Sequence, residues 1–123
     1  SVRAAINLLK EVGENKRKIL ILGEMSELGK YSEQLHLSLI DIILENEIDV
    51  VMLVGDNTEC IYDNLKSQME CLWQKSAKSL VGSDYMDLIL PGDCILVKGS
   101  RSMSMELIVK NLKEIYPIIQ EDN

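Results

Sequence analysis

Histidine is almost absent from the sequence, and the cysteines are few and far apart. The only histidine is His36, and the three cysteines are Cys60, Cys71 and Cys94. These residues cannot assemble a His/Cys metal cluster, and their positions signal neither a Ser-His nor a Cys-His nucleophile pair. Their odd number and wide spacing favour reduced thiols over a disulfide framework. We therefore predict no metal site and no catalytic nucleophile of this kind.

Positive charge and long apolar runs are also lacking. The 13 basic residues are outnumbered by 20 acidic ones, giving a net charge of −7. This balance argues against nucleic acid as a partner, because a protein that neutralises many phosphates carries the opposite charge. No apolar run approaches the roughly 20 residues of a membrane span, and the amino end has no signal-peptide pattern. We expect a cytoplasmic protein without a membrane span.

The length and composition suit one soluble domain. The 123 residues are 46% hydrophobic and 27% charged, which is typical of a globular chain with an ordinary core. The chain starts at Ser1 with no initiator methionine and enters a helical pattern at once. We therefore expect a domain cut from a longer protein.

Short apolar runs alternate with helical patterns along the chain. Runs of this length without polar residues are typical of strands buried on both faces of a parallel sheet. We predict strands at 19–22, 49–54 and 94–97, with a weaker signal at 69–73. Helices are expected at 2–12, from Ser32 onward, at 57–66, in part of 77–90 with a break near Gly82, and at 102–112. This alternation predicts an α/β fold with a mostly parallel sheet flanked by helices.

Local signals suggest how the helices begin and which sides they bury. Ser32 can cap the second helix, and Asp56 with Glu59 has capping-box spacing for the third. His36 lies beside a buried stripe and is expected to be a capped or half-buried histidine rather than a catalyst. The stripes expected to be buried are Val2, Ala5, Ile6, Leu9 and Val12 in the first helix, and Leu35, Leu39, Ile42 and Ile43 in the second.

The first loop of interest, Gly23–Gly29, directly follows a predicted strand. Ligands of open α/β sheets bind at the carboxyl ends of the strands. Two carboxylates, Glu24 and Glu27, lie between two glycines and can orient an amine or a metal-bound group. The alternative is a solvated connector whose glycines allow positive φ. The spacing leaves both interpretations open.

The second loop is Lys98-Gly99-Ser100-Arg101, again between a strand and a predicted helix. Backbone amides at a helix amino end attract anions, and Lys98 and Arg101 would add two positive charges there. The pattern favours a phosphate or carboxylate site. The alternative is a helix capped by Ser100 or Ser102 with solvated cations. Neither a Gly-x-x-x-x-Gly-Lys-Ser/Thr loop nor a Gly-x-Gly-x-x-Gly motif occurs in the chain.

Together these loops resemble two motifs in the last domain of MurF-type ligases, which belong to the Mur ligase family. Residues 21–29 read Ile-Leu-Gly-Glu-Met-Ser-Glu-Leu-Gly and are followed by Ser-Glu-Gln-Leu-His at 32–36. Residues 92–101 read Gly-Asp-Cys-Ile-Leu-Val-Lys-Gly-Ser-Arg. Both motifs are long, and they stand in the family's order and spacing. The resemblance extends from Ser1 to about Leu112.

The resemblance implies a function in peptidoglycan synthesis. Such ligases use ATP and Mg²⁺ to join D-alanyl-D-alanine to UDP-N-acetylmuramoyl tripeptide through an acyl phosphate. It further implies that residues 1–123 are a Rossmann-like C-terminal domain that closes over ATP and dipeptide. The amino-terminal domain for the UDP substrate and the central ATPase domain would lie outside this chain. We expect the isolated domain to be inactive, with no catalytic residue of its own.

The same resemblance suggests roles for the two loops. Lys98, Gly99, Ser100 and Arg101 would form the part of the site that closes on substrate or ATP. Glu24, Met25, Glu27 and Gly29 would support it, with the two carboxylates steadying the dipeptide ammonium group or bracing the neighbouring loop. Two alternatives remain: another Mur-family or folylpolyglutamate-type ligase, and a stand-alone α/β module that binds a small anion.

Overall fold

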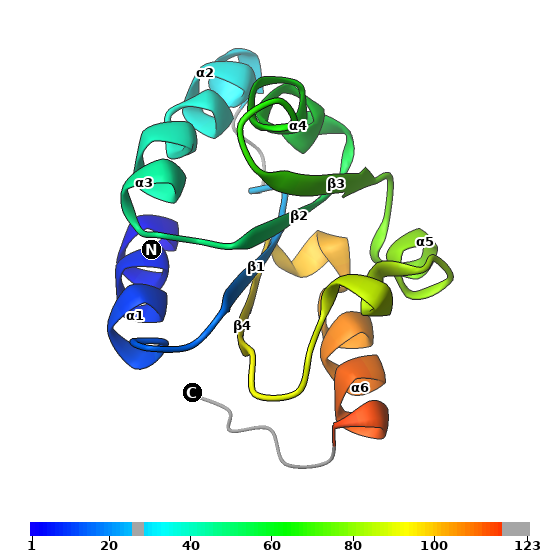
Figure 1. Ribbon diagram of the computed structural model, residues 1–123. Helices are drawn as coiled ribbons and strands as arrows, with labels where there is room; N and C mark the ends of the chain where they lie inside the picture. Colours follow the sequence, from blue (N-terminus) through cyan, green and yellow to red (C-terminus); the bar gives the residue numbers. More distant parts are fainter. Residues whose placement is uncertain (26–28, 117–123) are drawn as a thin grey trace.

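The computed structural model describes residues 1–25 and 29–116. Within them the chain forms one four-stranded sheet, in which every pair of neighbouring strands is parallel and the order is β3-β2-β1-β4 (Figure 1). The strands are β1 (Lys18–Gly23), β2 (Val50–Val54), β3 (Glu70–Gln74) and β4 (Cys94–Lys98). The predicted α/β fold with a parallel sheet is confirmed, and the weak strand signal at 69–73 corresponds to β3.

Helices connect the strands and cover both faces of the sheet (Figure 1). The α-helices are α1 (Val2–Val12), α2 (Ser32–Leu37), α3 (Leu39–Glu45), α4 (Glu59–Leu65), α5 (Ala77–Val81) and α6 (Glu106–Ile115). Short 3₁₀ turns lie at η1 (Gly29–Tyr31), η2 (Asp56–Thr58), η3 (Tyr85–Leu88) and η4 (Arg101–Met103). None of the helices in the described residues is long and apolar enough to cross a membrane.

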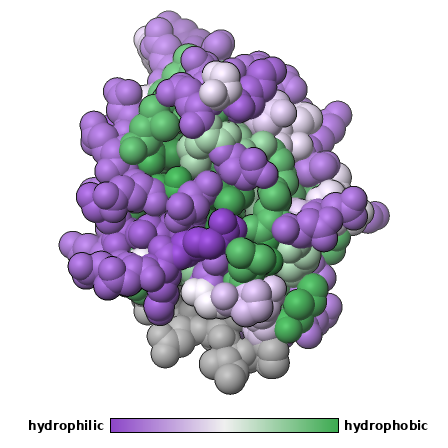
Figure 2. Space-filling model, in the orientation of Figure 1, coloured by the Kyte–Doolittle hydropathy of each residue, from purple (hydrophilic) through white to green (hydrophobic). Residues whose placement is uncertain are grey.

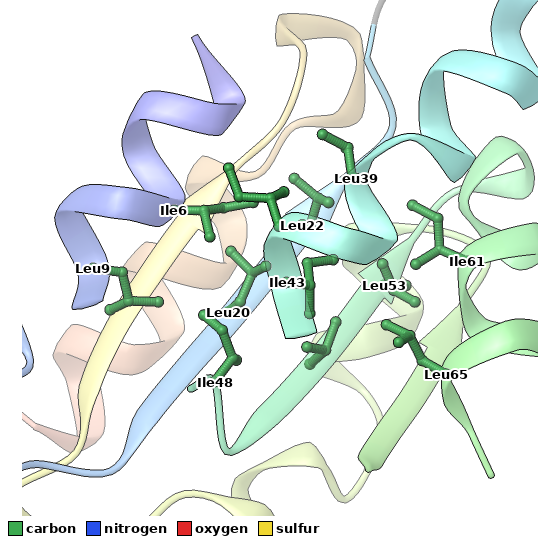
Figure 3. Packing of buried hydrophobic residues seen from close by; sticks show 12 residues of the cluster. Ile6, Leu9, Leu20, Leu22, Leu39, Ile43, Ile48, Leu53, Ile61 and Leu65 are labelled. Carbon is green, nitrogen blue, oxygen red and sulfur yellow. The ribbon is translucent and has the colours of Figure 1, made fainter. Parts of the chain in front are cut away.

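Two apolar clusters hold these layers together. Alternate residues of each central strand point to opposite faces, so Leu20 and Leu22 pack beneath α1, α3 and α4 (Figure 3). Ile19 and Ile21 pack on the opposite face, against α5, η3 and α6. Both β1 and β2 are buried along their whole length. Since burying one such side chain contributes about 1.5–3 kcal/mol, the two central strands anchor the domain.

Two residues of the predicted buried stripes are exposed instead. Val12 is 53% exposed because the chain turns at Gly13, which packs against Lys18 and Cys94 in its place. Leu35 is 43% exposed because the predicted second helix is divided at Ser38 into α2 and α3, so its stripe is not continuous. On the face drawn in Figure 1, other apolar side chains reach the surface over the middle of the sheet, among hydrophilic ones (Figure 2).

The predicted helix caps are wrong in two places. Ser32 is the first residue of α2, whose cap residue Tyr31 makes no side-chain bond. Asp56 and Glu59 form no capping box, because residues 56–58 form the 3₁₀ turn η2 and α4 begins only at Glu59.

Two carboxylates form hydrogen bonds at the amino-terminal edge of the sheet, which is the side where the strands begin. The Asp49 Oδ2 accepts the Lys18 backbone N–H at 2.8 Å, just before β2 begins. The Asp93 Oδ1 accepts the Arg17 Nε–H at 3.1 Å, and its Oδ2 accepts the Leu90 backbone N–H at 2.8 Å. Arg17 also donates to the Leu88 carbonyl. These contacts fix the entry of three strands.

Candidate functional site

The carboxyl-terminal edge of the sheet has a topological switch point. The connection from β1 to β2 carries α2 and α3 on one face, whereas the chain that leaves β4 continues into α6 on the other face. The chain segments that leave β1 and β4 therefore diverge, although the two strands are neighbours. Ligands of open α/β sheets bind in the crevice at such a point.

Both loops singled out from the sequence lie at this switch point and touch each other. The Ser100 backbone N–H donates to the Glu24 carbonyl oxygen at 3.2 Å. A Cβ atom on Gly99 would lie 3.0 Å from the Gly23 Cα and 2.8 Å from the Met105 Cγ. Glycine at position 99 is thus required for the two backbones to approach so closely.

Glu24 joins the loops that follow three strands. Its backbone N–H donates to Val54 at 3.0 Å, and its carbonyl accepts from Ser100. Its carboxylate accepts the Asn57 backbone N–H at 2.9 Å, at the start of the 3₁₀ turn after β2. The Glu24 carboxylate therefore braces the neighbouring loop and satisfies the backbone amide of Asn57 at the start of its 3₁₀ turn.

Residues 26–28 of the first loop, including Glu27, lie outside the described residues. Met25 and Gly29 are the described residues on either side of them. Met25 is half-buried, and its backbone N–H donates to the His36 Nε2 at 3.1 Å. His36 is fully buried in α2 rather than half-buried, and its Nδ1 lies 2.7 Å from the Ser32 carbonyl. Gly29 has φ of 57°, the left-handed conformation expected of a glycine connector.

Lys98 and Arg101 form the charged part of the second loop. Lys98 is the half-buried last residue of β4, and Arg101 is exposed. Neither side chain makes a hydrogen bond or an ion pair with another of the described residues. Two positive charges thus lie at the switch point without a described carboxylate partner, an arrangement that suits an anion.

The helix expected after this loop begins later than predicted. Residues 101–103 form η4, Ser104 is left-handed with φ of 53°, and α6 starts only at Glu106. Neither Ser100 nor Ser102 caps α6, and their hydroxyls bond to each other at 2.9 Å. Lys98 and Arg101 therefore do not lie at the amino end of a long helix. An anion would be held by side chains and loop amides instead.

Sequence reasoning missed the contribution of the loop after β2. The Trp73 Nε1–H donates to the Gly55 carbonyl at 2.8 Å and holds this loop against β3. Gly55 has φ of 109°, and a Cβ there would meet Glu24 and Met103. A glycine at the carboxyl end of a strand was the available signal, since Gly23 ends β1 and Gly99 follows β4.

The remaining chemistry of the described residues lies away from these loops. No group of three or more described His, Cys, Asp or Glu residues is placed to hold a metal ion. Burial raises the pKa of Cys71 to about 12, with a contribution from the charge of Glu70, and burial alone raises the pKa of Tyr85 to about 12. One surface hollow lies along α6, and another lies at the amino-terminal edge beside Arg17 and Asp49.

Known proteins share both the sequence pattern and the fold. The UDP-N-acetylmuramoyl-tripeptide–D-alanyl-D-alanine ligase of Rickettsia prowazekii is 38% identical over 109 residues, which are 89% of this chain and 24% of that protein. The protein of the same name from Bacillus subtilis is 32% identical over 116 residues, 93% of this chain and 25% of that protein. A crystal structure of MurF from Acinetobacter baumannii has a TM-score of 0.75 and 26% identity, covering 93% of this chain and 25% of that chain.

A second solved structure, MurF ligase from Thermotoga maritima in complex with ADP, shares the fold. It has a TM-score of 0.67 and 23% identity, covering 91% of this chain and 26% of that chain. The chain thus spans about a quarter of the length of the relatives it matches. Residues 1–101 match the family profile described as Mur ligase, glutamate ligase domain. Because this match covers most of the chain, the protein belongs to the Mur ligase family through that domain.

Proposed function

We propose that this chain is the C-terminal domain of an ATP-dependent ligase that joins D-alanyl-D-alanine to UDP-N-acetylmuramoyl tripeptide. The relatives from Rickettsia prowazekii and Bacillus subtilis carry that name, and the chain matches about a quarter of each. The complete protein would then have three domains, with residues 1–123 as the last. We place it in the cytoplasm, where its nucleotide-linked substrate and ATP are available.

The ligation consists of two transfers. The terminal carboxylate of the tripeptide takes the γ-phosphoryl group of ATP, forming an acyl phosphate and ADP. The dipeptide amine then attacks the acyl carbon, a C–N bond forms, the C–O bond to phosphate breaks, and the amine loses a proton. ATP and Mg²⁺ would be held mainly by a central domain outside this chain. This domain would close over ATP and dipeptide and be inactive alone.

The observation that carries the site assignment is the position of Lys98 and Arg101 at the switch point. Their side chains are not paired with other described residues, whereas the backbone beneath them is tied to Glu24. We propose that the two cations and the Ser100 hydroxyl bind the dipeptide carboxylate or a phosphate oxygen when the domain closes. Charge-assisted hydrogen bonds of this kind contribute about 1.5–3 kcal/mol each. Gly99 permits the close backbone approach, and Glu24, with Met25, Glu27 and Gly29, supports the loop.

Two other functions make different predictions. A Mur-family ligase that adds lysine or diaminopimelate, or a folylpolyglutamate-type ligase, would use the same fold with another amine substrate. The Lys-Gly-Ser-Arg sequence at 98–101 favours the D-alanyl-D-alanine ligases. A stand-alone α/β module would instead bind a small anion without any further domain.

The test is an acceptor panel assayed with the complete protein that contains this chain. We would measure phosphate release from ATP with UDP-N-acetylmuramoyl tripeptide and, in turn, D-alanyl-D-alanine, lysine, diaminopimelate and glutamate. The proposal expects turnover with D-alanyl-D-alanine far above the other three, and none with the isolated 123-residue chain. Turnover with lysine, diaminopimelate or glutamate instead would contradict the assignment. Phosphate binding by a free-standing chain without any turnover would support the binding module.

A further inference from the structure

The buried imidazole of His36 has a single proton arrangement that fits its neighbours. Its Nδ1 lies 2.7 Å from the Ser32 carbonyl oxygen, which can only accept a hydrogen bond, so Nδ1 must carry the proton. Its Nε2 lies 3.1 Å from the Met25 backbone nitrogen, which can only donate, so Nε2 must present a lone pair. His36 is therefore neutral and protonated on Nδ1, and 0% of it is exposed to solvent.

The peptide group that His36 holds also contacts the second loop. The Met25 N–H and the Glu24 C=O belong to the same peptide group, which is planar and rigid. His36 accepts from the N–H side, and the Ser100 N–H donates to the C=O side at 3.2 Å. Hydrogen bonds in series polarise and strengthen one another. One peptide plane thus connects the imidazole in α2 with the loop at 98–101.

We propose that His36 is a positioning residue for the loop Lys98–Arg101. The neutral imidazole sets the orientation of the 24–25 peptide, and this peptide sets the position of the Ser100 amide between the two cations. Two hydrogen bonds, His36 to Met25 and Glu24 to Ser100, define this connection. Its consequence for substrate binding rests on the proposed function.

Two variants separate the hydrogen bond from the packing. His36→Leu fills most of the buried space but removes the acceptor, leaving the Met25 N–H without its partner. His36→Gln places an amide oxygen near the former Nε2 and can still accept from Met25. Ile43→Val is a control in α3, because it trims a buried side chain of the same apolar layer without removing a side-chain hydrogen bond.

The first test is nuclear magnetic resonance of the 123-residue chain. We expect ¹⁵N shifts of the His36 ring that show a protonated Nδ1 and an unprotonated Nε2. We also expect the Ser100 amide to exchange with solvent roughly tenfold faster in His36→Leu, and at about the wild-type rate in His36→Gln and Ile43→Val. A proton on Nε2, or an unchanged Ser100 exchange rate in His36→Leu, would overturn the proposal.

The second test is steady-state kinetics of the complete ligase. His36→Leu should raise KM for D-alanyl-D-alanine or ATP roughly tenfold, the factor that 1.4 kcal/mol produces, with a much smaller change in kcat. His36→Gln should restore most of the affinity. If Ile43→Val raises KM as much as His36→Leu, or if His36→Gln restores nothing, His36 has only a structural role.

The first test does not depend on the proposed function, whereas the kinetic test does. If the complete protein ligates no acceptor in the panel, the proposed function is wrong. The ring proton and the Ser100 exchange rate would still decide whether His36 positions the loop.

Discussion

The two edges of the sheet are built in opposite ways from similar residues. At the amino-terminal edge, Arg17 is paired with Asp93 and bonds the Leu88 carbonyl, and the Asp93 side chain is only 3% exposed. At the carboxyl-terminal edge, Lys98 and Arg101 have no such partner among the described residues. The cation at the amino-terminal edge stabilises the fold, and the cations at the carboxyl-terminal edge are not paired with other described residues.

The acidic residues follow the same division. Asp49 and Asp93 accept backbone amides at the amino-terminal edge, so both of these carboxylates serve the fold. At the other edge Glu24 also accepts a backbone amide, from Asn57, and forms no ion pair with another described residue. Charged residues occur at both edges, so charge alone does not mark a site. The proposed site lies at the edge where positive charge is not neutralised by described residues and the backbone beneath it is fixed.

Asp93→Ala should cause the largest loss of stability, since it removes the partner of Arg17 and of the Leu90 amide at once. We expect the free energy of unfolding to fall by about 3 kcal/mol, because a nearly buried charged group loses two hydrogen bonds. Urea denaturation of the 123-residue chain would measure this loss. Asp63→Ala is the matched control, because it removes an exposed pair with Lys66 that contributes at most about 0.5 kcal/mol.

The same substitution tests the division between the edges in the complete protein, assayed for the proposed ligation. Asp93→Ala should leave kcat/KM within about twofold of wild type at temperatures where the variant is folded, a change well below the tenfold that 1.4 kcal/mol produces. A larger loss of kcat/KM would show that the amino-terminal edge also serves the reaction.

Gly99→Ala should have the next largest effect and should act on both stability and activity. The new Cβ would crowd the Met105 side chain and the Gly23 backbone, so we expect a loss of about 1–3 kcal/mol. Because the two loops must then separate, kcat/KM of the complete ligase should fall as well. Gly82→Ala is the control, since its Cβ would meet only the Lys78 and Ser79 carbonyls at 3.6 and 3.8 Å. Equal behaviour of the two variants would contradict the close approach of the loops.

A smaller effect on the free energy of unfolding is expected from Tyr85, which is buried in the interior away from both edges. Burial raises the pKa of its hydroxyl from 10.0 to about 12, and the hydroxyl donates to the Asn111 side chain. A raised pKa means that folding favours the protonated form, so this contribution is complete below pH 10 and is lost as the pH rises toward 12. The free energy of unfolding should therefore fall over this range. The free energy of unfolding of Tyr85→Phe should fall less steeply with pH than that of wild type. Tyr31→Phe changes an exposed tyrosine, and its free energy of unfolding should change with pH as that of wild type does.

Most of the fold could be predicted because its signals are local. The apolar runs at 19–22 and 94–97 specify strands, and the break near Gly82 ends α5 as expected. The signal for β3 was weak because the strand begins at Glu70 and ends at Gln74, which leaves only three apolar residues between them. Parallel topology followed from the alternation of strands and helices.

The errors arose where distant contacts decide local structure. The Asp56–Glu59 capping box was wrong because residues 56–58 form a 3₁₀ turn, which Glu24 contacts from a different strand end through the Asn57 amide. The start of α6 was wrong because Ser104 takes a left-handed conformation that nothing in its neighbours signals. Both candidate loops were found from the sequence, but their contact through Gly99 and Ser100 depends on strand order. The environment of His36 also depends on its hydrogen bond with Met25, which lies 11 residues earlier in the chain.

The most direct test of the central claim is the pair of variants Lys98→Ala and Arg101→Ala in the complete ligase, with kinetics and stability measured together. We expect each to lower kcat/KM for D-alanyl-D-alanine or ATP by roughly tenfold to a hundredfold, the range that about 1.5–3 kcal/mol produces. The free energy of unfolding should change by no more than about 0.5 kcal/mol, since neither side chain bonds another described residue. Unchanged kcat/KM in both variants would contradict the assignment of the site to the carboxyl-terminal edge.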